Sequence, residues 1–542
     1  MMTTSPFSLY APAYNPGLNQ PKSKPVNPEG PMADAVFSAN GTAGGAVDLE
    51  LDGKGRLWQK SFSGEWDLRG VLNTQGQYLM QNGQQGDVFV NSNPAQQGLL
   101  DIPLTNQTHP FIQLLRRYQQ QGAIAGSEIP RLKNIFNAWG LTGNGIKVGI
   151  LDPYDPLELE GVDLKTAQGE PGQAWTAGDH TKVISDLVND PAVGMAPRTI
   201  VVDRGFVPTD DKTLKEDDNI NAAIYNMVRT TCILYDDATR QIYKNLRQKP
   251  EDPRILSMTW GGSPLTTLDS LRDAINQMED NGEYSFKNTR SQILGQWGIG
   301  QTPQERNTLN QSPVEQDIAL LNFISKTMQN PMIQQAHQRF MEATRQAAMR
   351  GQFIVVASGN EHNQGPNIQE IARKNPRLAY HPEVQKLINA AEFDMLAKSP
   401  YVISVAASNT NRTPGYRQDD IISEFSSWGE NAGYHPTIAA PGQNVYIPRP
   451  YETMNSNHVE SGTSFAVPYV CANLSLILEA LLKANPRLGN SPALYNLVVQ
   501  ILQGTATRLP NYPVAAQGAG VINPELAVAQ AFQVANRVKA NL

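Results

Sequence analysis

Three residues that together could perform acyl transfer stand where the sequence pattern predicts strand ends or helix starts. Asp152 directly follows the apolar run Val148-Gly-Ile-Leu, His180 opens a helical pattern, and Ser464 opens a long apolar one. A serine hydroxyl becomes a nucleophile when a histidine takes its proton and a carboxylate orients that histidine. Taken singly, each residue has a simpler explanation: a turn Asp, a lone helix-start His and a helix-capping Ser.

The order of Asp152, His180 and Ser464 along the chain narrows the architectures that could hold such a triad. Asp, then His, then Ser is neither the chymotrypsin order nor the α/β-hydrolase order. The Gly-x-Ser-x-Gly turn of the α/β-hydrolases is also missing, since Ser464 lies in Glu460-Ser-Gly-Thr-Ser-Phe-Ala-Val-Pro. The sequence therefore indicates a different scaffold.

The scaffold must bring Asp152, His180 and Ser464 together. The alternation of apolar and helical stretches after residue 141 predicts which fold does so. Short apolar strands alternate with helical stretches, which predicts an α/β fold with a mainly parallel sheet and helices on both faces. Sites on such sheets form at the carboxyl ends of the strands. The predicted strands are 146–151, 199–202, 255–258, 353–357 and 402–406.

Composition excludes several classes of protein. The 542 residues include 44 Lys and Arg against 51 Asp and Glu, a net charge of −7, and no basic block occurs, which argues against a nucleic-acid binder. Two cysteines, Cys232 and Cys471, cannot form a disulfide framework and are expected to be buried thiols. No apolar run is long enough to predict a transmembrane helix.

Eight motifs occur in a fixed order along the chain. They are Trp139-Gly-Leu-Thr-Gly-Asn-Gly-Ile-Lys-Val-Gly-Ile-Leu-Asp152, Gly194-Met-Ala-Pro197, Ile255-Leu-Ser-Met-Thr-Trp-Gly-Gly262, Ile354-Val-Val-Ala-Ser-Gly-Asn360-Glu, Phe425-Ser-Ser-Trp-Gly429, Ile438-Ala-Ala-Pro-Gly442, the string around Ser464, and Gly518-Ala-Gly-Val-Ile-Asn523. From about residue 129 to residue 532, the sequence resembles the subtilisin-like serine proteases (subtilase family, peptidase S8).

The resemblance implies a three-layer subtilisin-like fold and a serine endopeptidase that works through an acyl-enzyme. It implies that Ser464 attacks the scissile carbonyl, that His180 moves the proton and that Asp152 orients His180. It also implies that Asn360 donates to the oxyanion. The implied substrate-binding wall, which should bind peptide backbone, consists of Ser257, Met258, Thr259, Trp260, Gly261 and Gly262.

The histidine motif departs from the family pattern His-Gly-Thr-x-Val, because His180 is followed directly by Thr181. Either one glycine is deleted, or Asp179 occupies the catalytic position. The second alignment would break the triad and give an inactive pseudoprotease that binds peptides or proteins. We favour the deletion, with a local turn that differs because Thr adopts glycine conformations poorly.

The chain divides into four predicted regions. Residues 1–35 are expected to be a disordered tail, and residues 36–105 a small β-rich or irregular extension that could be a propeptide. Residues 106–140 form a helical linker, and residues 141–542 form the peptidase domain. Two insertions in that domain, 264–331 and 362–400, leave the predicted sheet near the cleft and contain helical patterns such as Val314–Met328.

The expected partner is a peptide or protein substrate, with no nucleic acid and no membrane span; the oligomeric state is not readable. No cofactor and no metal site are predicted. The resemblance allows calcium, but the acidic run Glu216-Asp-Asp218 is interpreted as a surface loop. No secretory signal pattern opens the sequence, so a cytoplasmic location is expected, with non-classical secretion as the alternative.

Overall fold

The structure is a computed structural model of the 542-residue chain. It describes five strands between residues 49 and 103, a few residues between 268 and 298, and these ranges: 129–153, 179–209 except 192, 220–265 except 250, 299–362 except 312, 391–409, 421–447 except 431–432, and 459–540 except 485 and 491. The predicted tail, residues 1–35, and the run Glu216–Asp218 lie outside this part of the chain.

A six-stranded sheet forms the centre of the fold, in the order β11-β10-β9-β8-β6-β7, and every neighbouring pair is parallel. The five predicted strands are all present, and β8 and β9 have the predicted bounds. The sheet's sixth strand, β11, was recognised only as a family motif. The bounds are β6 Lys147–Ile150, β7 Ile200–Asp203, β8 Ile255–Met258, β9 Phe353–Ala357, β10 Ile403–Asn409 and β11 Ile438–Gln443.

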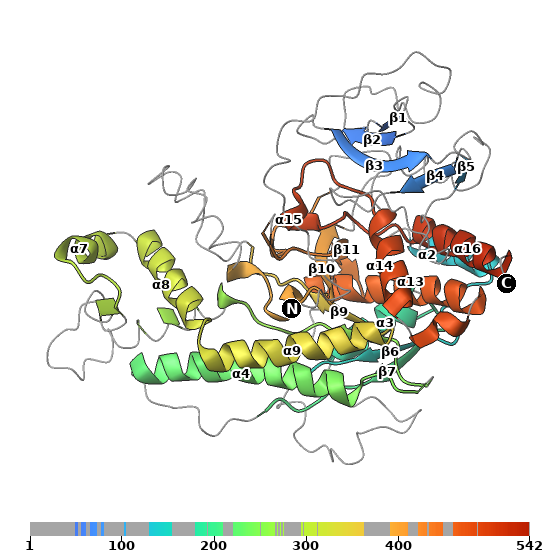
Figure 1. The fold of residues 1–542 in the computed structure, drawn as a ribbon. Helices are drawn as coiled ribbons and strands as arrows, with labels where there is room; N and C mark the ends of the chain where they lie inside the picture. Colours follow the sequence, from blue (N-terminus) through green and yellow to red (C-terminus); the bar gives the residue numbers. More distant parts are fainter. Residues whose placement is uncertain are drawn as a thin grey trace, which may run out of the picture.

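Helices cover both faces of this sheet (Figure 1). One face packs against α13, which also contacts α3 and α16, and the other packs against the paired helices α4 and α9. The predicted three-layer α/β fold is therefore confirmed. The helices of the first face are α2 Ile129–Ala138, α3 Asp179–Asn189, α13 Thr463–Ala484, α14 Pro492–Gly504 and α16 Pro524–Ala540; those of the second are α4 Ile220–Lys244 and α9 Pro331–Met349.

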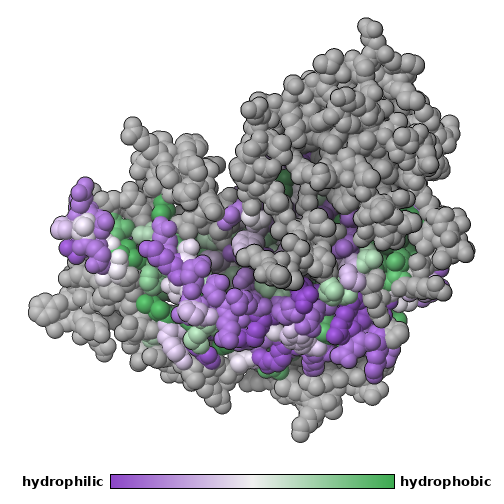
Figure 2. Space-filling model, viewed as in Figure 1, coloured by the Kyte–Doolittle hydropathy of each residue, from purple (hydrophilic) through white to green (hydrophobic). Residues whose placement is uncertain are grey.

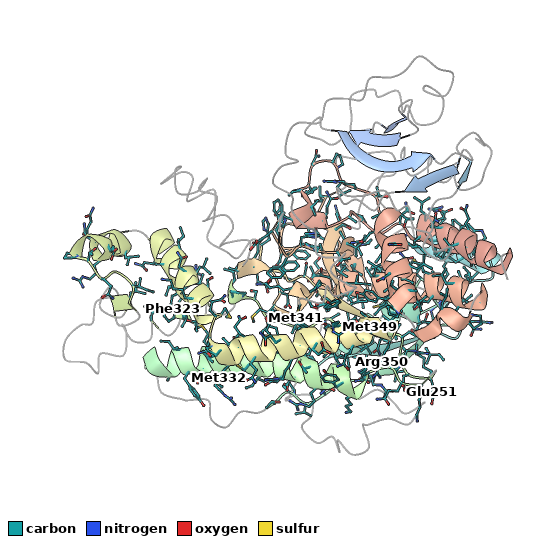
Figure 3. The ribbon with its side chains drawn as sticks, viewed as in Figure 1. Glu251, Phe323, Met332, Met341, Met349 and Arg350 are labelled. Carbon is teal, nitrogen blue, oxygen red and sulfur yellow. The ribbon has the colours of Figure 1, made fainter. Side chains whose placement is uncertain are left out.

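Helix α9 shows how sequence pattern sets the outer layer. It begins at Pro331, whose missing N–H costs nothing in a first turn, and the side chain of Asn330 accepts a hydrogen bond from the N–H of Met332. Its buried residues recur at helical spacing toward the sheet. Hydrophilic side chains gather over the outer faces of α4 and α9 (Figure 2). Met332 and Met349 mark the two ends of α9 (Figure 3).

Helix α2 ends as the sequence predicts. Leu132 and Phe136 are buried on its inner face. Gly140 follows with φ +71°, a left-handed conformation that closes helices and that glycine adopts without steric cost. The chain then turns into β6, the strand that carries Asp152.

Two further sheets are small. Strands β1 Leu49–Leu51, β2 Arg56–Lys60, β3 Trp66–Leu72, β4 Gln77–Met80 and β5 Ile102–Pro103 form an antiparallel sheet within the region predicted to be β-rich. Strands β12 Val445–Tyr446 and β13 Val459–Glu460 pair immediately before α13.

The first insertion contains the helices α7 Pro303–Gln311 and α8 Pro313–Thr327, so the helix predicted from Val314 is confirmed. Leu268, Leu271 and Ile275 pack with residues of α8 in a hydrophobic cluster of their own. Of the second insertion, the structure describes 391–400, including the short 3-10 helix η3 Leu396–Lys398.

Only one helix in the described residues, α13, is long and apolar enough to cross a membrane, and 94% of its apolar window is buried inside the protein. Burial at that level is what a core helix of a folded domain shows, and α13 packs directly on the central sheet.

Candidate active site

Asp152 lies just beyond the end of β6, between the ends of β7 and β8, and is only 2% exposed. Its Oδ1 accepts a hydrogen bond from the Thr259 hydroxyl at 2.5 Å, and its backbone carbonyl accepts one from the N–H of Phe206 at 3.1 Å. A buried carboxylate needs such partners because it has lost water. These contacts fix the orientation of its second oxygen, Oδ2.

His180 stands at the start of α3 and reaches Oδ2 of Asp152 with its Nδ1, at 2.9 Å. Because a carboxylate only accepts, Nδ1 carries the proton and Nε2 is left as the basic nitrogen. The ring meets Phe465 edge-on, with 5.8 Å between the ring centroids. Phe465 directly follows Ser464, so this contact brings the imidazole to the start of α13.

The missing glycine after His180 is accommodated within α3. Thr181 is helical, and Asn444 is the one non-glycine residue with positive φ in the described part of the chain. The Thr181 hydroxyl donates to Oδ2 of Asp152 at 3.4 Å. The expected difference in the local turn therefore takes the form of a helix that begins at Asp179, with Thr181 as an additional partner of the aspartate.

Ser464 is the second residue of α13 and is partly exposed. Its hydroxyl donates to the carbonyl of Thr259 at 3.1 Å. The first N–H groups of a helix have no partner within the helix, and the helix dipole is positive at this end. Negative charge that develops beside Ser464 would therefore be stabilised by α13 itself.

Asn360 follows β9 and faces the same helix start. Its Oδ1 accepts from the backbone N–H of Thr463 at 2.8 Å and from the Thr463 hydroxyl at 2.9 Å. Because both donors hold the oxygen, the amide nitrogen Nδ2 is the atom left to donate. It lies near Gly462, 3.7 Å from where a Cβ on that glycine would be.

Sequence reasoning missed the groups that hold the Asn360 loop. The Glu361 carboxylate accepts from the N–H of Asn360 at 2.7 Å and from the Ser427 hydroxyl at 2.9 Å. Gly359 has φ +107°, and a Cβ there would lie 2.4 Å from the Glu361 carboxylate. Burial raises the pKa of Glu361. The only sequence signal was the position of Glu361 directly after Gly-Asn.

A second missed group lies next to this loop. The Nδ1 of His362 is 2.9 Å from the carboxylate of Glu392, which also accepts from the N–H of Trp428 at 2.9 Å. The His362 ring stacks on Trp428 with 4.5 Å between centroids. Burial raises the pKa of Glu392. No spacing rule links these three residues, so the sequence alone gave no signal for the contact.

The first two residues of the predicted substrate-binding wall lie within β8. The side chains of Ser257 and Met258 are fully buried; Ser257 is paired with both β6 and β9, and Met258 with β9. Trp260 packs inward, because its indole N–H donates to the carbonyl of Leu151 and its ring contacts Phe206.

Thr259 is the first residue of the predicted wall that contacts residues of the predicted triad. Thr259 is buried, but its carbonyl accepts a hydrogen bond from the Ser464 hydroxyl. Gly261 is exposed and Gly262 is half-exposed.

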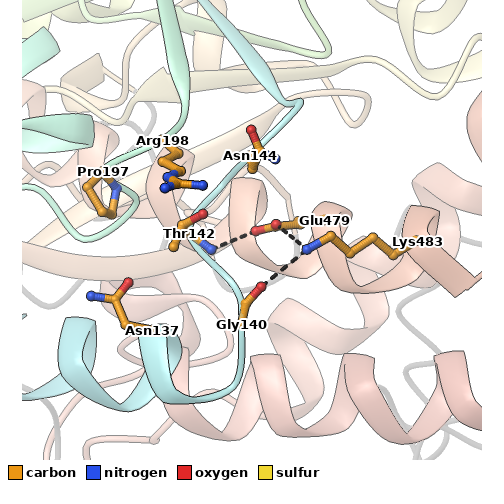
Figure 4. A pocket seen from close by; sticks show the side chains of 8 residues that line it. All are labelled: Asn137, Gly140, Thr142, Asn144, Pro197, Arg198, Glu479 and Lys483. Atoms are coloured by element: carbon orange, nitrogen blue, oxygen red, sulfur yellow. Dashed lines mark hydrogen bonds and ion pairs between the residues drawn. The ribbon is translucent and has the colours of Figure 1, made fainter.

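A polar pocket of about 600 Å³ lies elsewhere, between the turn before β6 and the later part of α13 (Figure 4). Glu479 accepts there from the N–H groups of Thr142 and Gly143, both at 2.7 Å, and from Lys483 at 2.6 Å. Along a straight helix, the rise from Ser464 to Glu479 is about 22 Å. We assign this pocket no part in the chemistry.

The contacts of Glu479 predict a structural role. Replacing Glu479 with alanine is expected to lower the free energy of unfolding by about 2–4 kcal/mol, because two backbone amides lose their acceptor. Lys483→Ala removes an exposed cation that pairs with Glu479 and donates to the carbonyl of Gly140. It is expected to cost under about 1 kcal/mol, because Glu479 keeps its two amide donors. Urea unfolding followed by tryptophan fluorescence measures both. Equal midpoints for Glu479→Ala and the unchanged protein would contradict this role.

No group of three or more His, Cys, Asp or Glu side chains that could hold a metal ion occurs among the residues the structure describes. Both cysteines are buried and free, as the sequence analysis expected, and Cys471 lies within α13.

Comparison with known proteins adds a family match. Residues 209–520 match the family model described as the subtilase family, Peptidase S8. The matched stretch contains the wall, Asn360 and Ser464, but it begins after Asp152 and His180. A comparison with curated proteins found no match.

Several solved structures of proteases show weak similarity. The prenylagaramide maturation protease PagA is 16% identical with a TM-score of 0.36, and the match covers 74% of this chain and 98% of that one. A lanthipeptide protease is 13% identical with a TM-score of 0.36 and coverage of 77% and 95%. MycP1 with its N-terminal propeptide removed is 17% identical with a TM-score of 0.35 and coverage of 74% and 96%.

Proposed function

This chain belongs to the subtilase family of serine peptidases, and we propose that it is an endopeptidase that works through Asp152, His180 and Ser464. The observation that carries the proposal is the 2.9 Å contact between His180 Nδ1 and Asp152 Oδ2, with the His180 ring packed on Phe465, the residue after Ser464. This contact also counts against the alternative of an inactive protein with Asp179 in the catalytic position.

The chemistry follows from the proton positions. Ser464 attacks the peptide carbonyl while Nε2 of His180 takes its proton, and the same proton then passes to the leaving amine. Water next attacks the acyl-enzyme, with His180 again as the base. Asp152 keeps the imidazole oriented and stabilises its charged form. The peptide is cleaved and Ser464 is regenerated.

Substrate binding would also release the nucleophile. The carbonyl of Thr259 accepts the Ser464 hydroxyl here. A peptide that adds as a strand along Thr259–Gly262 would offer a backbone N–H to such a carbonyl. The hydroxyl of Ser464 could then turn toward Nε2 of His180. Because backbone atoms make this contact, it needs no free peptide terminus, which supports endopeptidase activity.

Labelling with a fluorophosphonate tests the proposal. We expect the unchanged protein to be labelled, and both Ser464→Ala and His180→Ala to be unlabelled. Ser461→Ala is the matched control, because Ser461 is an exposed serine whose hydroxyl accepts only from the N–H of Asn444 at 2.9 Å. Absence of labelling in the well-folded unchanged protein would contradict the active triad and favour a peptide-binding role. Internally quenched peptides blocked at both ends test the endopeptidase activity.

The oxyanion role proposed for Asn360 gives a further prediction. Asn360→Ala is expected to lower kcat about 10²–10³-fold with little change in KM, because the donor acts on charge that exists only in the transition state. Thr463→Val keeps the backbone donor to Oδ1 of Asn360 and is expected to cost less. Steady-state kinetics on one blocked peptide gives both values. An Asn360→Ala enzyme with normal kcat would remove this residue from the mechanism.

A further inference from the structure

Asp394 places a carboxylate against the substrate-binding wall. Gly261 is exposed on that wall, and a Cβ built on it would lie only 1.9 Å from Oδ2 of Asp394. The carboxylate therefore occupies the space beside the Cα of Gly261 that a side chain would take. Asp394 itself is 6% exposed.

The backbone at Asp394 connects the two walls that flank the reacting atoms. The N–H of Asp394 donates to the carbonyl of Ser358 at 3.0 Å, and the N–H of Met395 donates to the carbonyl of Gly262 at 2.9 Å. Ser358 follows β9 and Gly262 follows β8, which are neighbouring parallel strands. Residues 394 and 395 thus lie across the gap between the two strand ends, and we call them the floor.

A bound peptide would direct one particular side chain toward this floor. Its reactive carbonyl must lie between Ser464 and Asn360, and Asn360 lies only two residues beyond Ser358 on the same wall. This carbonyl belongs to the substrate residue immediately before the cleaved bond, and the side chain of that residue is attached to the adjacent Cα. In a strand paired with residues 259–262, that side chain enters the gap above Asp394.

The Asp394 carboxylate has capacity for another donor. Oδ1 accepts from the N–H groups of Leu396 at 2.7 Å and Ala397 at 3.3 Å, at the start of η3. Among the described residues, none donates a hydrogen bond to Oδ2. A buried carboxylate oxygen without a donor is costly, and a cationic side chain would provide charge-assisted hydrogen bonds.

Burial and the charged groups around Asp394 shift the pKa of its carboxyl. Burial is the main cause that raises its pKa, to about 8; the amides at η3 lower it, the Glu361 carboxylate raises it and Lys398 lowers it. From α4, the buried Tyr235 also interacts with this charge. Glu361 adds a second carboxyl close to Asp394, and Lys398 offsets part of this charge. Oδ2 of Asp394 still offers an acceptor to a cationic side chain, whereas an anion would face both carboxyls.

We propose that Asp394 determines specificity for the side chain immediately before the cleaved bond, and that this enzyme prefers arginine or lysine there. The inference rests on the proposed peptidase function and names its substrate class. It makes Asp394 a residue that contacts the substrate, although it lies in an insertion far from the triad in sequence.

Four blocked, internally quenched peptides that differ only at this residue test the preference: arginine, citrulline, leucine and glutamate. Citrulline has nearly the shape of arginine but no charge. We expect kcat/KM for arginine to exceed that for citrulline by about 10²-fold or more, because a buried charged pair is replaced by an unpaired group. Glutamate is expected to be cleaved least.

The ratio of arginine to citrulline rates also gives a pH test. The free enzyme should ionise Asp394 as the pH rises through about 8, so the ratio should increase from pH 7 to pH 9. Cleavage of the citrulline peptide also requires His180 as the base. Its pH dependence therefore measures any titration of the triad itself. A ratio that stays constant over this range would contradict the role of Asp394.

Asp394→Asn removes the charge but keeps an oxygen that can accept from Leu396 and Ala397. We expect the arginine to citrulline ratio to fall to within about threefold, while citrulline cleavage continues. Asp236→Asn is the matched control, since Asp236 is a half-exposed aspartate of α4 that pairs with Arg339, and it should leave the ratio unchanged. A ratio that persists in Asp394→Asn would overturn the proposal.

Failure of this inference can be distinguished from failure of the proposed function. Cleavage of all four peptides with equal rates for arginine and citrulline would overturn the specificity and leave the peptidase intact. If no peptide is cleaved, or Asp394→Asn does not fold, calorimetry on Ser464→Ala decides. Peptides that end in arginine should bind at least about tenfold more tightly than those that end in citrulline, and equal affinity would overturn the inference.

Discussion

Replacing Ser464 with alanine is expected to lower kcat for peptide hydrolysis about 10⁶-fold, and His180→Ala is expected to have nearly the same effect. The two residues act as one unit: without the base the hydroxyl stays protonated, and without the hydroxyl the base has no nucleophile to activate. The double variant should therefore be little worse than either single one. The residual rate should come from Asn360 and the N-terminus of α13, which remain in place.

Progress curves on one blocked peptide, run over days at high enzyme concentration, measure these rates. Ser461→Ala provides the control for serine substitution in the same loop. Circular dichroism and the urea midpoint should match the unchanged protein, since Ser464 makes one hydrogen bond at the surface of the core. If Ser464→Ala retained a tenth of the activity, a different nucleophile would be at work.

Asp152→Asn is expected to lower kcat about 10⁴-fold while KM changes little. Both oxygens of Asp152 accept hydrogen bonds, from His180 on one side and from Thr259 on the other. An amide in this position would have to turn its NH₂ toward one of them. Turned toward His180, it would favour the tautomer with the proton on Nε2, the nitrogen that must act as the base.

Thr259 makes this prediction testable in a second way. In Thr259→Val, the donor to Oδ1 is lost and Asp152 is held less firmly. In the double variant Thr259→Val with Asp152→Asn, the total loss of kcat should be smaller than the combined losses of the two single variants, because both substitutions disrupt the same contact. Strictly additive losses would indicate that Thr259 does not act through Asp152.

The sequence alone predicted the fold class and much of the sheet. Strand β9 is buried on both faces and is apolar without interruption, and β8 is interrupted only by Ser257, so both stand out from the polar helix surfaces around them. The family-like motif at the end of β9 also gave Asn360 as a site candidate, and the one at the start of α13 gave Ser464. Local pattern sufficed there because each of these signals lies within a few consecutive residues.

Features of the site that depend on contacts between distant segments could be read only from the tertiary structure. The choice between Asp179 and His180 as the partner of Asp152 depended on where α3 begins. The interior position of Ser257 and Met258 depended on strands pairing on both sides of β8.

The contact between Gly261 and Asp394 joins a cleft residue to a residue in an insertion, and Glu479 joins α13 to the turn before β6. No hydrophobic periodicity and no motif spacing in the sequence predicts these contacts. Residues far apart in the chain become neighbours only when the core packs. A single sequence therefore determined the elements of this protein, and packing determined its site.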